Sequence, residues 1–446
     1  MSSNTILKYA ALNTPRYTSY PTAPHFHGGV DQAVYAQWLG EIGGAMTGSI
    51  YLHIPYCREM CWYCGCSTKA TRRAAPVDAY VDVLLQEIAQ TAARLRTRPR
   101  IDHIHFGGGT PTLVHPDQLA GIMTALREGF DVSPAAEIAV EIDPRQCSQS
   151  LVETLASLGF NRASLGVQTF DPAIQAKINR IQSRETVTAC VERLRSVGIN
   201  AISLDLLYGL PGETVTSCQE TVAAALELEP DRFSVFGYAH LPHLKSHQRL
   251  IADADLPGPD ARVRHAMAIA DALNEAGYTP IGLDHFARAD DRMSAQAQCG
   301  TLRRNFQGYT TDQADFLIGL GASAIGKLPQ GYVQNASSVA DWTRRIQAGE
   351  PATIRGYALS SEDRLRADII ERLMCDLRVD REAVTRSYQT GFPDAFLDDL
   401  YEDGVVCEDG GSLRVPEHFR MLARTVAARF DAHLGQAPGA VHARSV

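Results

Sequence analysis

SIYLHIPYCREMCWYCGC, residues 49–66, joins a β-strand pattern to a run of four cysteines. The first seven residues are rich in β-branched, aromatic and aliphatic side chains, which is typical of a buried strand. The cysteines follow at once with the spacing C-x3-C-x2-C-x-C, at positions 57, 61, 64 and 66. The first unit of the fold is therefore a strand whose carboxyl end carries candidate ligands.

The same unit, a β-rich segment followed by a helical pattern, recurs along the first half of the chain. The β-rich segments are 49–55, 101–109, 137–144, 162–168, 201–209 and 232–240. The helical patterns between them have apolar residues three and four positions apart, over 77–95, 116–130, 150–160, 184–198 and 214–228. Strand–helix alternation predicts an α/β fold with a parallel sheet. Because six units are fewer than the eight of a closed barrel, we predict a partial (β/α)6 barrel of the TIM type, with a doubly wound sheet as the alternative.

Polar residues gather at the carboxyl ends of these segments. They are Gly107 to Thr110, Glu141 with Asp143, Gln168, Asp205 with Tyr208, and Tyr238 with His240. One such residue could simply cap a helix or satisfy a loop. Because strand-to-helix loops converge on this rim of a barrel, their repetition favours an active site there.

Three regions outside the six units complete the predicted organisation. We expect residues 1–45 to be an N-terminal extension over the active site and 46–290 to be the barrel. Residues 291–355 are expected to form a substrate-side loop and connection. Residues 356–446 combine helical patterns with a hairpin signal at Asp409-Gly410-Gly411, which predicts a small, mostly helical, winged-helix-like domain. That domain lacks a basic excess, so a lid or packing role is favoured over DNA binding.

Composition narrows the function further. The chain has 446 residues, 45% of them hydrophobic, and a net charge of −9. This balance argues against nucleic acid or an anionic membrane as the main partner. The N-terminus has no secretory signal pattern, and no run approaches the roughly 20 apolar residues of a membrane helix. We therefore expect a cytoplasmic protein with reduced thiols, in which clustered cysteines indicate a metal or redox site.

The spacing of the cysteines favours an iron–sulfur cluster over zinc. Structural zinc usually takes two separated pairs of ligands, and no second pair lies near this run. Cys57, Cys61 and Cys64 on one loop could hold three corners of a cubane cluster. Since such clusters usually take four cysteines, the fourth iron would stay open for another ligand.

The wider set of motifs resembles a known family. C-x3-C-x2-C with an aromatic residue before the third cysteine resembles the cluster motif of radical S-adenosylmethionine enzymes, and GGGTP at 107–111 resembles their segment for the methionine amino group. The match narrows with a series of segments that spans nearly the whole chain: PRYTSYPTA (15–23), CGC (64–66), EIDPR (141–145), GVQTF (166–170), DLLYGLP (205–211), RFSVFGYAHLP (232–242), DHFA (284–287) and RRNFQGYTT (303–311). Together they resemble the oxygen-independent coproporphyrinogen III oxidases of haem biosynthesis.

This resemblance implies a [4Fe–4S] cluster on Cys57, Cys61 and Cys64, and two molecules of S-adenosyl-L-methionine. A 5′-deoxyadenosyl radical would abstract hydrogen from two propionate side chains of coproporphyrinogen III. Each would lose carbon dioxide and become a vinyl group, giving protoporphyrinogen IX. The resemblance also implies a low-potential electron donor of the flavodoxin or ferredoxin type and a monomeric enzyme.

The resemblance also assigns residues to the two cofactor molecules. For the first it implies Tyr51, Gly108, Glu141 and Ile325. For the second it implies Tyr63, Gly109, Thr110, Gln168, Arg180, Asp205 and Ala239. The family often has Phe in place of Tyr63, so the added hydroxyl needs a partner.

Candidate catalytic and substrate residues complete the predicted site. Tyr51 and His53 should face the same side of the first strand, and we take both, with Cys66, as candidate catalytic residues. Cys66 should be required for turnover but not for cluster assembly. The four propionates of the substrate need cationic partners, for which the candidates are Arg16, Arg145, Arg303 and Arg304.

Three alternatives stay open. A haem chaperone of the same superfamily would bind without catalysis, but Cys66, PRYTSYPTA and RRNFQGYTT count against it. Another porphyrin-modifying radical enzyme is the second. A zinc-binding winged-helix regulator is the third and would need a basic recognition face.

Overall fold

The structure, a computed structural model, describes residues 2–10 and 12–436. Its centre is one mixed sheet with the strand order β16-β15-β14-β13-β1-β4-β5-β6-β7-β8-β10-β9. The middle of this sheet is parallel and contains the six predicted strands in chain order: β1 (Thr47–Ile54), β4 (Arg100–Gly108), β5 (Asp131–Ile142), β6 (Arg162–Gln168), β7 (Ala201–Tyr208) and β8 (Arg232–Gly237). The predicted α/β fold with a central parallel sheet is confirmed.

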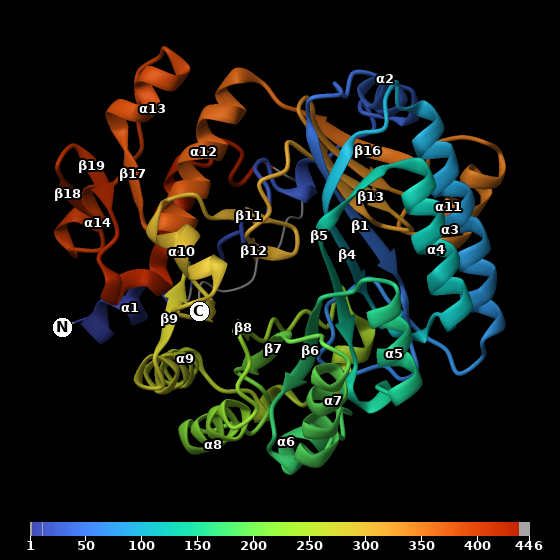
Figure 1. Ribbon diagram of the computed structural model, residues 1–446. Coiled ribbons are helices and arrows are strands. Elements are labelled where there is room, and N and C mark those ends of the chain that lie inside the picture. The colour runs from blue at the N-terminus through green and yellow to red at the C-terminus, as the bar shows by residue number, and fades with distance from the viewer. Residues whose placement is uncertain (1, 11, 437–446) are drawn as a thin grey trace.

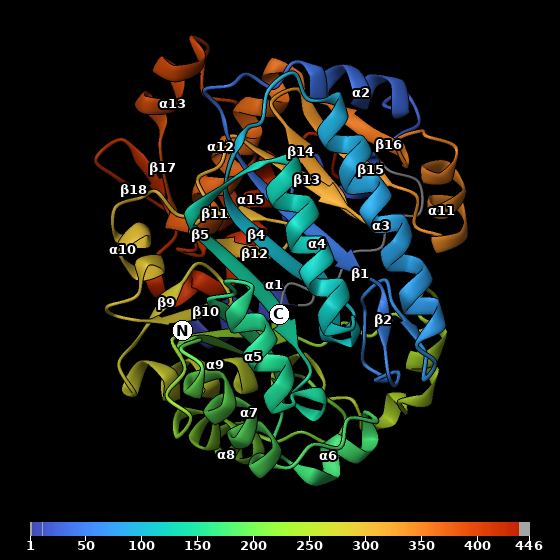
Figure 2. The same cartoon turned by 45° about the vertical axis from the view of Figure 1, so that its right-hand side comes forward.

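Helices cover the outer face of these strands, as Figures 1 and 2 show for α3 and α4 beside β1, β4 and β5. The helices are α3 (Ala75–Arg94), α4 (Pro116–Gly129), α5 (Gln149–Ser157), α6 (Pro172–Lys177), α7 (Arg184–Ser196), α8 (Val215–Leu226) and α9 (Pro259–Glu275). Serine or threonine side chains cap several of them, as Ser183 does by accepting a hydrogen bond from the backbone of Thr186. The chain leaves α7 through Gly198, whose φ of +89° favours glycine.

Short strands extend both ends of the parallel sheet. Beyond β1 lie β13 (Phe316–Leu320), parallel to it, and then the antiparallel β14 (Ile325–Leu328), β15 (Gly331–Asn335) and β16 (Thr353–Ala358). Beyond β8 lie the antiparallel β10 (His285–Arg288) and β9 (Tyr278–Ile281).

The extension at β13 differs from the expectation for residues 291–355. Only a loop and connection were expected, whereas this region contains β13, β14, β15 and the helix α11 (Val339–Gln347). The expected boundary at residue 356 also falls inside β16. These strands are four to six residues long and several contain glycine, so they carry too little periodicity to be distinguished from loops. The same region also contributes α10 (Arg292–Gln298) and the hairpin β11 (Arg303–Asn305) and β12 (Gly308–Thr310).

A buried carboxylate joins α3 to this extension. Glu87 is 4% exposed, and its side chain accepts hydrogen bonds from the backbone of Gly321 at 2.6 Å, from Asn335 at 2.7 Å and from Trp342 at 3.1 Å. Its burial raises its pKa to about 7, against the hydrogen bonds that lower it. The missed strands are thus tied to the barrel by a polar contact inside the core.

The C-terminal region forms a second core together with the N-terminus. It comprises α12 (Ser361–Asp376), α13 (Arg381–Tyr388), α14 (Asp398–Glu402), α15 (Ala423–Ala427) and a small antiparallel sheet of β17 (Arg378–Asp380), β19 (Ser412–Arg414) and β18 (Cys407–Asp409). Helix α1 (Ser2–Ala10) lies beside this C-terminal module in Figure 1, and Tyr9 donates a hydrogen bond to Asp403 at 2.6 Å. Ile6 and Tyr9 are buried in its apolar cluster. The N-terminal segment therefore packs on the C-terminal module as well as on the barrel.

Two features connect the N-terminal segment to the sheet. Asp31 caps the start of helix α2 (Gln32–Gly40) with its carboxylate, and His27 pairs with Gly356 of β16.

Among the described residues, no helix combines the length and the apolar character needed to cross a membrane.

Candidate active site

The cysteine loop begins where β1 ends and therefore lies at the carboxyl edge of the sheet. Its first two residues pair as β2 (Tyr56–Cys57) with β3 (Lys69–Ala70), which closes the base of the loop. The Thr68 hydroxyl lies 3.2 Å from the sulfur of Cys57. The backbone N–H of Cys66 donates to the sulfur of Cys64 at 3.4 Å. Both sulfurs thus have a hydrogen-bond donor within reach.

Two arginines face the sulfur of Cys61, which is 8% exposed. Arg180 Nη1 lies 3.5 Å from this sulfur and Arg145 Nη2 lies 3.8 Å from it. Asp143 pairs with Arg145 at 2.6 Å and lies 3.7 Å from Arg180. Cations and donors beside sulfur stabilise the thiolate, which is the form that ligates metals. The three cysteines therefore fit an iron–sulfur cluster.

A segment after β8 holds the cysteine loop in place, and the sequence analysis did not identify it. Three side chains around the turn η4 (Ser246–Leu250) donate hydrogen bonds to backbone carbonyl oxygens of the loop. The bonds run from Gln248 to Tyr63 at 2.9 Å, from His247 to Cys64 at 2.7 Å and from Lys245 to Cys66 at 2.9 Å. Side chain to backbone contacts across such a sequence distance leave no pattern in the sequence.

Tyr51 and His53 face the same side of β1, as predicted. The Tyr51 hydroxyl lies 3.0 Å from His53 Nδ1, and His53 Nε2 lies 2.9 Å from the carbonyl oxygen of Ser67. Because a carbonyl oxygen can only accept, Nε2 carries the proton and Nδ1 accepts from Tyr51. Burial lowers the pKa of His53, which favours this neutral tautomer. His53 thus connects β1 to the residue that follows Cys66.

The glycines after β4 let the backbone approach its neighbours closely. Gly108 has a φ of +114°, and a Cβ there would lie 2.7 Å from the His53 ring. A Cβ on Gly109 would lie 2.5 Å from the carbonyl oxygen of Tyr56. Only glycine fits both positions without displacing the base of the cysteine loop.

Two buried carboxylates lie on the next strands. Glu141 accepts a hydrogen bond from the backbone N–H of Gly108 at 3.0 Å. Burial opposes ionisation of Glu141, but the hydrogen bonds and charge of His105 lower its pKa, with further help from Gly108. Asp205 accepts from the Ser164 hydroxyl at 3.2 Å. Burial, followed by the charge of Glu141, raises the pKa of Asp205 to about 6.

The other predicted cofactor residues lie around the same edge. Gln168 ends β6 with a φ of +70°, an unusual conformation for a residue other than glycine. Thr110 is buried and its backbone donates to Tyr56 at 2.7 Å. Gln248 donates to the carbonyl oxygen of Ala239 at 3.2 Å as well as to that of Tyr63, which connects these two predicted residues.

Ile325 reaches this edge through the strands that the sequence analysis missed. Register pairs Gly319 of β13 with Tyr51 of β1. A Cβ on Gly319 would lie 2.6 Å from the carbonyl oxygen of Ile325. The extension of the sheet therefore places Ile325 on β14, which is separated from the strand that carries Tyr51 by β13 alone.

The candidate arginines for substrate separate into two groups. Arg145 faces Cys61, and Arg303 pairs with Glu371 at 3.2 Å. Arg16 and Arg304 instead line a cavity of about 1030 Å³ at the ends of β7 and β8. Of the four, the structure therefore places two where a substrate could reach them.

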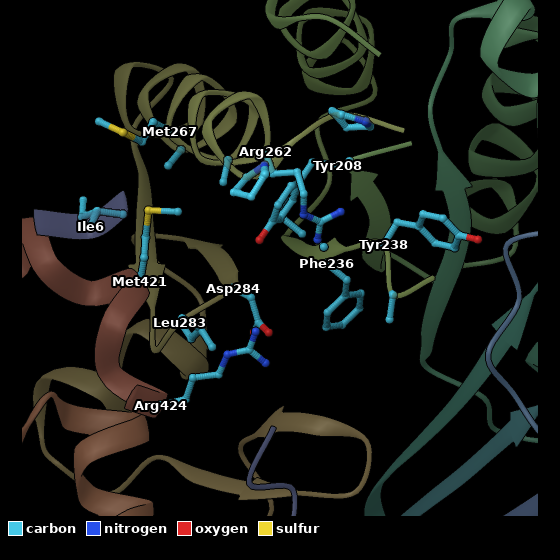
Figure 3. A pocket seen from close by; sticks show the side chains of 18 of the residues that line it. Ile6, Tyr208, Phe236, Tyr238, Arg262, Met267, Leu283, Asp284, Met421 and Arg424 are labelled. Carbon is cyan, nitrogen blue, oxygen red and sulfur yellow. The ribbon is translucent and has the colours of Figure 1, made fainter. Parts of the chain in front are cut away.

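Figure 3 shows this cavity from close by, with Tyr208, Phe236 and Tyr238 on one side and Met421 and Arg424 on the other. Ala239, a predicted cofactor residue, also lines it. The cavity thus adjoins the segment that holds the cysteine loop. An apolar wall with several charged groups is typical of a ligand site.

Comparisons with known proteins agree with this geometry. Residues 51–225 match the Radical SAM superfamily model. The chain is 52% identical to an oxygen-independent coproporphyrinogen III oxidase of Bradyrhizobium diazoefficiens, over 100% of both chains. It is 38% identical to the protein of that name from Escherichia coli K12, over 95% of this chain and 93% of the other. The solved structure of coproporphyrinogen III oxidase from Escherichia coli, described as a radical SAM enzyme, has a TM-score of 0.90 and 37% identity over 94% of this chain and 98% of that one.

Proposed function

The chain belongs to the family of oxygen-independent coproporphyrinogen III oxidases, within the radical S-adenosylmethionine superfamily, and we propose that the carboxyl edge of its sheet holds a cluster and two S-adenosylmethionine molecules. Its reaction is the oxidative decarboxylation of two propionate side chains of coproporphyrinogen III to vinyl groups, which gives protoporphyrinogen IX. The observation that supports the site most directly is the convergence of donors and cations on the sulfurs of Cys57, Cys61 and Cys64.

The three cysteines would ligate a [4Fe–4S] cluster. When bound, the cluster and S-adenosylmethionine supply an electron and a radical that abstracts hydrogen. The protein's own part is to fix the loop, exclude water and orient the reactants. The loop is fixed by hydrogen bonds to three of its carbonyl oxygens from Gln248, His247 and Lys245.

The first S-adenosylmethionine would contact Tyr51, Gly108, Glu141 and Ile325. The Gly108 backbone can approach a ligand closely, and the Glu141 carboxylate suits an ammonium group or a hydroxyl. Two observations support this set: the Glu141 side chain accepts a hydrogen bond from Gly108, and Ile325 lies on β14, one strand beyond the β13 that pairs with β1.

The second S-adenosylmethionine would contact a different set of residues: Tyr63, Gly109, Thr110, Gln168, Arg180, Asp205 and Ala239. Arg180 is 7% exposed and its Nε has no acceptor among the described residues. A carboxylate ligand would satisfy such a donor and pair with the guanidinium charge. Burial raises the pKa of the Tyr63 hydroxyl, against the nearby charge of Arg180, so this hydroxyl stays neutral and can donate.

Tyr51, His53 and Cys66 are proposed to act on the substrate side. The Tyr51–His53–Ser67 hydrogen bonds keep a neutral imidazole beside the cysteine loop. Cys66 is exposed, and its backbone N–H and its thiol both hydrogen-bond Cys64. Residues 1–45 would cover the substrate, because Arg16 lines the large cavity and donates to Gly237 at the end of β8.

The remaining partners follow from the chemistry. A low-potential donor of the flavodoxin or ferredoxin type would supply electrons to a monomeric, cytoplasmic enzyme. Nucleic acid and membrane are not expected partners, since the net charge is −9.

The test is anaerobic reconstitution with iron and sulfide, followed by S-adenosylmethionine, reductant and coproporphyrinogen III. We expect about four irons and four sulfides per chain and conversion of substrate to protoporphyrinogen IX, measured by chromatography after oxidation. Cys57→Ala, Cys61→Ala and Cys64→Ala should each lose the cluster, whereas Cys299→Ala, an exposed cysteine of another region, should keep it. Zinc without sulfide would refute the cofactor, and tight haem binding without turnover would indicate a chaperone.

A further inference from the structure

The cavity at the ends of β7 and β8 is built from parts of the chain that are far apart in sequence. Its lining comes from the N-terminal segment, from the barrel and its helix α9, and from the C-terminal module through η6 (Glu417–Leu422) and α15. Its volume of about 1030 Å³ lies at the upper end for small-molecule sites. This size suits a macrocycle and requires all three parts of the chain.

Three arginines share the cavity: Arg16 from the N-terminal segment, Arg304 from β11 and Arg424 from α15. We name them the arginine cluster. Arg16 donates to the Gly237 carbonyl oxygen at 3.1 Å, and Arg304 donates to the Arg16 carbonyl oxygen at 3.1 Å. Among the described residues, Arg304 Nε and Nη1 have no acceptor. Arg424 is 6% exposed and comes from the C-terminal module. Hydrogen bonds to backbone oxygens orient Arg16 and Arg304 but leave their charges to be balanced by another group.

Asp284 faces this cluster, and Glu371, which pairs with Arg303, also lies near Arg304. Figure 3 shows Asp284 and Arg424 reaching toward one another. Burial would raise the pKa of Asp284, but His285, Arg304 and Arg16 lower it to about 2, so it is ionised. Burial lowers the pKa of Arg424 to about 10, and the charges of Arg16 and Arg304 add to that effect. Positive charge therefore exceeds negative charge around Asp284, which favours a bound anion.

Much of the remaining wall is apolar and aromatic, beside other charged residues that include Asp253, Asp271 and Glu417. Tyr208, Phe236 and Tyr238 line one side, and Met267 and Met421 line another. Arg262 lies over the Tyr208 ring, 5.6 Å from its centroid. A ligand with an apolar body and carboxylates at its edge matches this distribution of surfaces.

The chemistry of the reaction separates the four carboxylates of the substrate into two pairs. Two leave as carbon dioxide, and an ion pair to either would stabilise the charged ground state more than the transition state, which slows the reaction. The other two keep their charge from substrate to product. Ion pairs to these two hold the macrocycle throughout both decarboxylations at no cost to the chemical step.

We propose that the arginine cluster binds the two propionate carboxylates that the substrate keeps in its product. The inference rests on the proposed function and goes further, because it assigns the anchoring end of the substrate and gives the C-terminal module a direct part in binding. Arg16 and Arg304 were candidates from the sequence, whereas Arg424 comes from the structure alone. Arg145 and Arg303 have no part in this site.

The test compares two stable porphyrins by fluorescence titration of the reconstituted enzyme with S-adenosylmethionine. Coproporphyrin III has four carboxylates, and mesoporphyrin IX has only the pair that corresponds to the retained propionates. Arg304→Gln and Arg16→Gln should each raise the Kd by about tenfold, as expected for loss of one charge-assisted contact. The factor should be the same for both porphyrins. Arg414→Gln, an exposed arginine of β19 that pairs with Asp409, should bind both like the wild type.

Two results would overturn the inference. If only coproporphyrin III binds more weakly to the variants, the cluster holds the reacting side chains. If neither porphyrin is affected, the cavity is not the anchoring site. Because Arg16→Gln changes an exposed side chain, we expect this variant to fold even if Arg304→Gln does not. Circular dichroism checks the folding of both variants. Failure of the wild type to convert coproporphyrinogen III would refute the proposed function instead, independently of these binding ratios.

Discussion

The guanidinium of Arg180 lies 3.5 Å from the sulfur of Cys61, although the two residues are 119 positions apart in the chain. The same guanidinium donates to the carbonyl oxygen of Gly166 at the end of β6. Arg180 therefore connects the predicted cluster loop to the strand edge that would hold the second cofactor molecule. Its Nε still lacks an acceptor among the described residues, so a ligand has a donor available.

Arg180→Gln should separate cluster assembly from cofactor binding. The three cysteines stay intact, so iron and sulfide content should match the wild type. Loss of one charge-assisted contact should raise the Kd for S-adenosylmethionine about tenfold and lower turnover at least as much. The measurement is electron paramagnetic resonance of the reduced enzyme during titration with S-adenosylmethionine.

Arg184→Gln is the matched control for Arg180. Arg184 begins α7, pairs with Glu227 and is 43% exposed, so its removal should leave both readouts unchanged. Wild-type affinity in Arg180→Gln would contradict the assignment of Arg180 to the cofactor.

Cys66→Ser should keep the cluster and lose turnover. Cys66 contacts the Cys64 side chain through its backbone N–H and through its thiol, and serine retains the N–H and a side-chain donor. Lys245 binds the Cys66 carbonyl oxygen, not its thiol. Serine can therefore make the same contacts to the cysteine loop as Cys66 does. Iron and sulfide analysis together with product formation measures both effects.

Cys299→Ser provides the comparison for Cys66, because Cys299 is also exposed but lies at the end of α10. It should retain cluster and activity alike. Loss of iron in Cys66→Ser would mean that the thiol is needed for assembly, against the division of the cysteines into three ligands and one further residue.

His53→Leu should lower activity without loss of the cluster. Leucine removes the hydrogen-bond acceptor for the Tyr51 hydroxyl and the donor to the Ser67 carbonyl oxygen. Both groups lose their partner. We expect turnover to fall by about tenfold to a hundredfold. Tyr51→Phe removes only the first of the two bonds and should have a smaller effect through His53.

The pH dependence of turnover tests the protonation state of His53. Burial lowers its pKa, so its charged form gains population only below the ordinary value of about 6.5. Wild-type turnover should therefore show no loss that depends on His53 between pH 8 and 6.5. A loss in that range that is absent from His53→Leu would show a charged imidazole. His115→Leu, an exposed histidine at the start of α4, is the control for removing a histidine.

The sequence predicted the parts of the fold that repeat. Six strand–helix units have enough length and periodicity to be recognised, and their strands correspond to β1 and β4 to β8. The strands β13 to β16 are too short for that, although β14 carries Ile325, a predicted cofactor residue. The cysteine spacing predicted the ligand loop, while the contacts from Gln248, His247 and Lys245 depend on a fold that brings distant segments together.

The arginines show the same limit. A sequence indicates that cations are present but not which way they face. Arg145 was a candidate for substrate binding, but it faces Cys61. Arg424 lines the cavity, but it lies in a helical segment and the sequence did not indicate it as a substrate residue. Tertiary packing of the C-terminal module on the barrel determines which of these arginines lines the cavity.

Glu87→Gln should change how the stability of the protein depends on pH. The folded-state pKa of Glu87 is raised to about 7 by burial, above its value of about 4.3 in an unfolded chain. Stability from this group is therefore complete below about pH 4.3 and is lost as pH rises through about 7, because the unfolded chain ionises first. Between pH 5 and 8 the wild type should lose about 2.5 kcal/mol of unfolding free energy that Glu87→Gln does not lose. Urea unfolding followed by circular dichroism at both pH values measures the difference. Glu128→Gln, an exposed glutamate of α4, should follow the wild type, and an equal pH dependence in Glu87→Gln would show that Glu87 ionises normally in the folded protein.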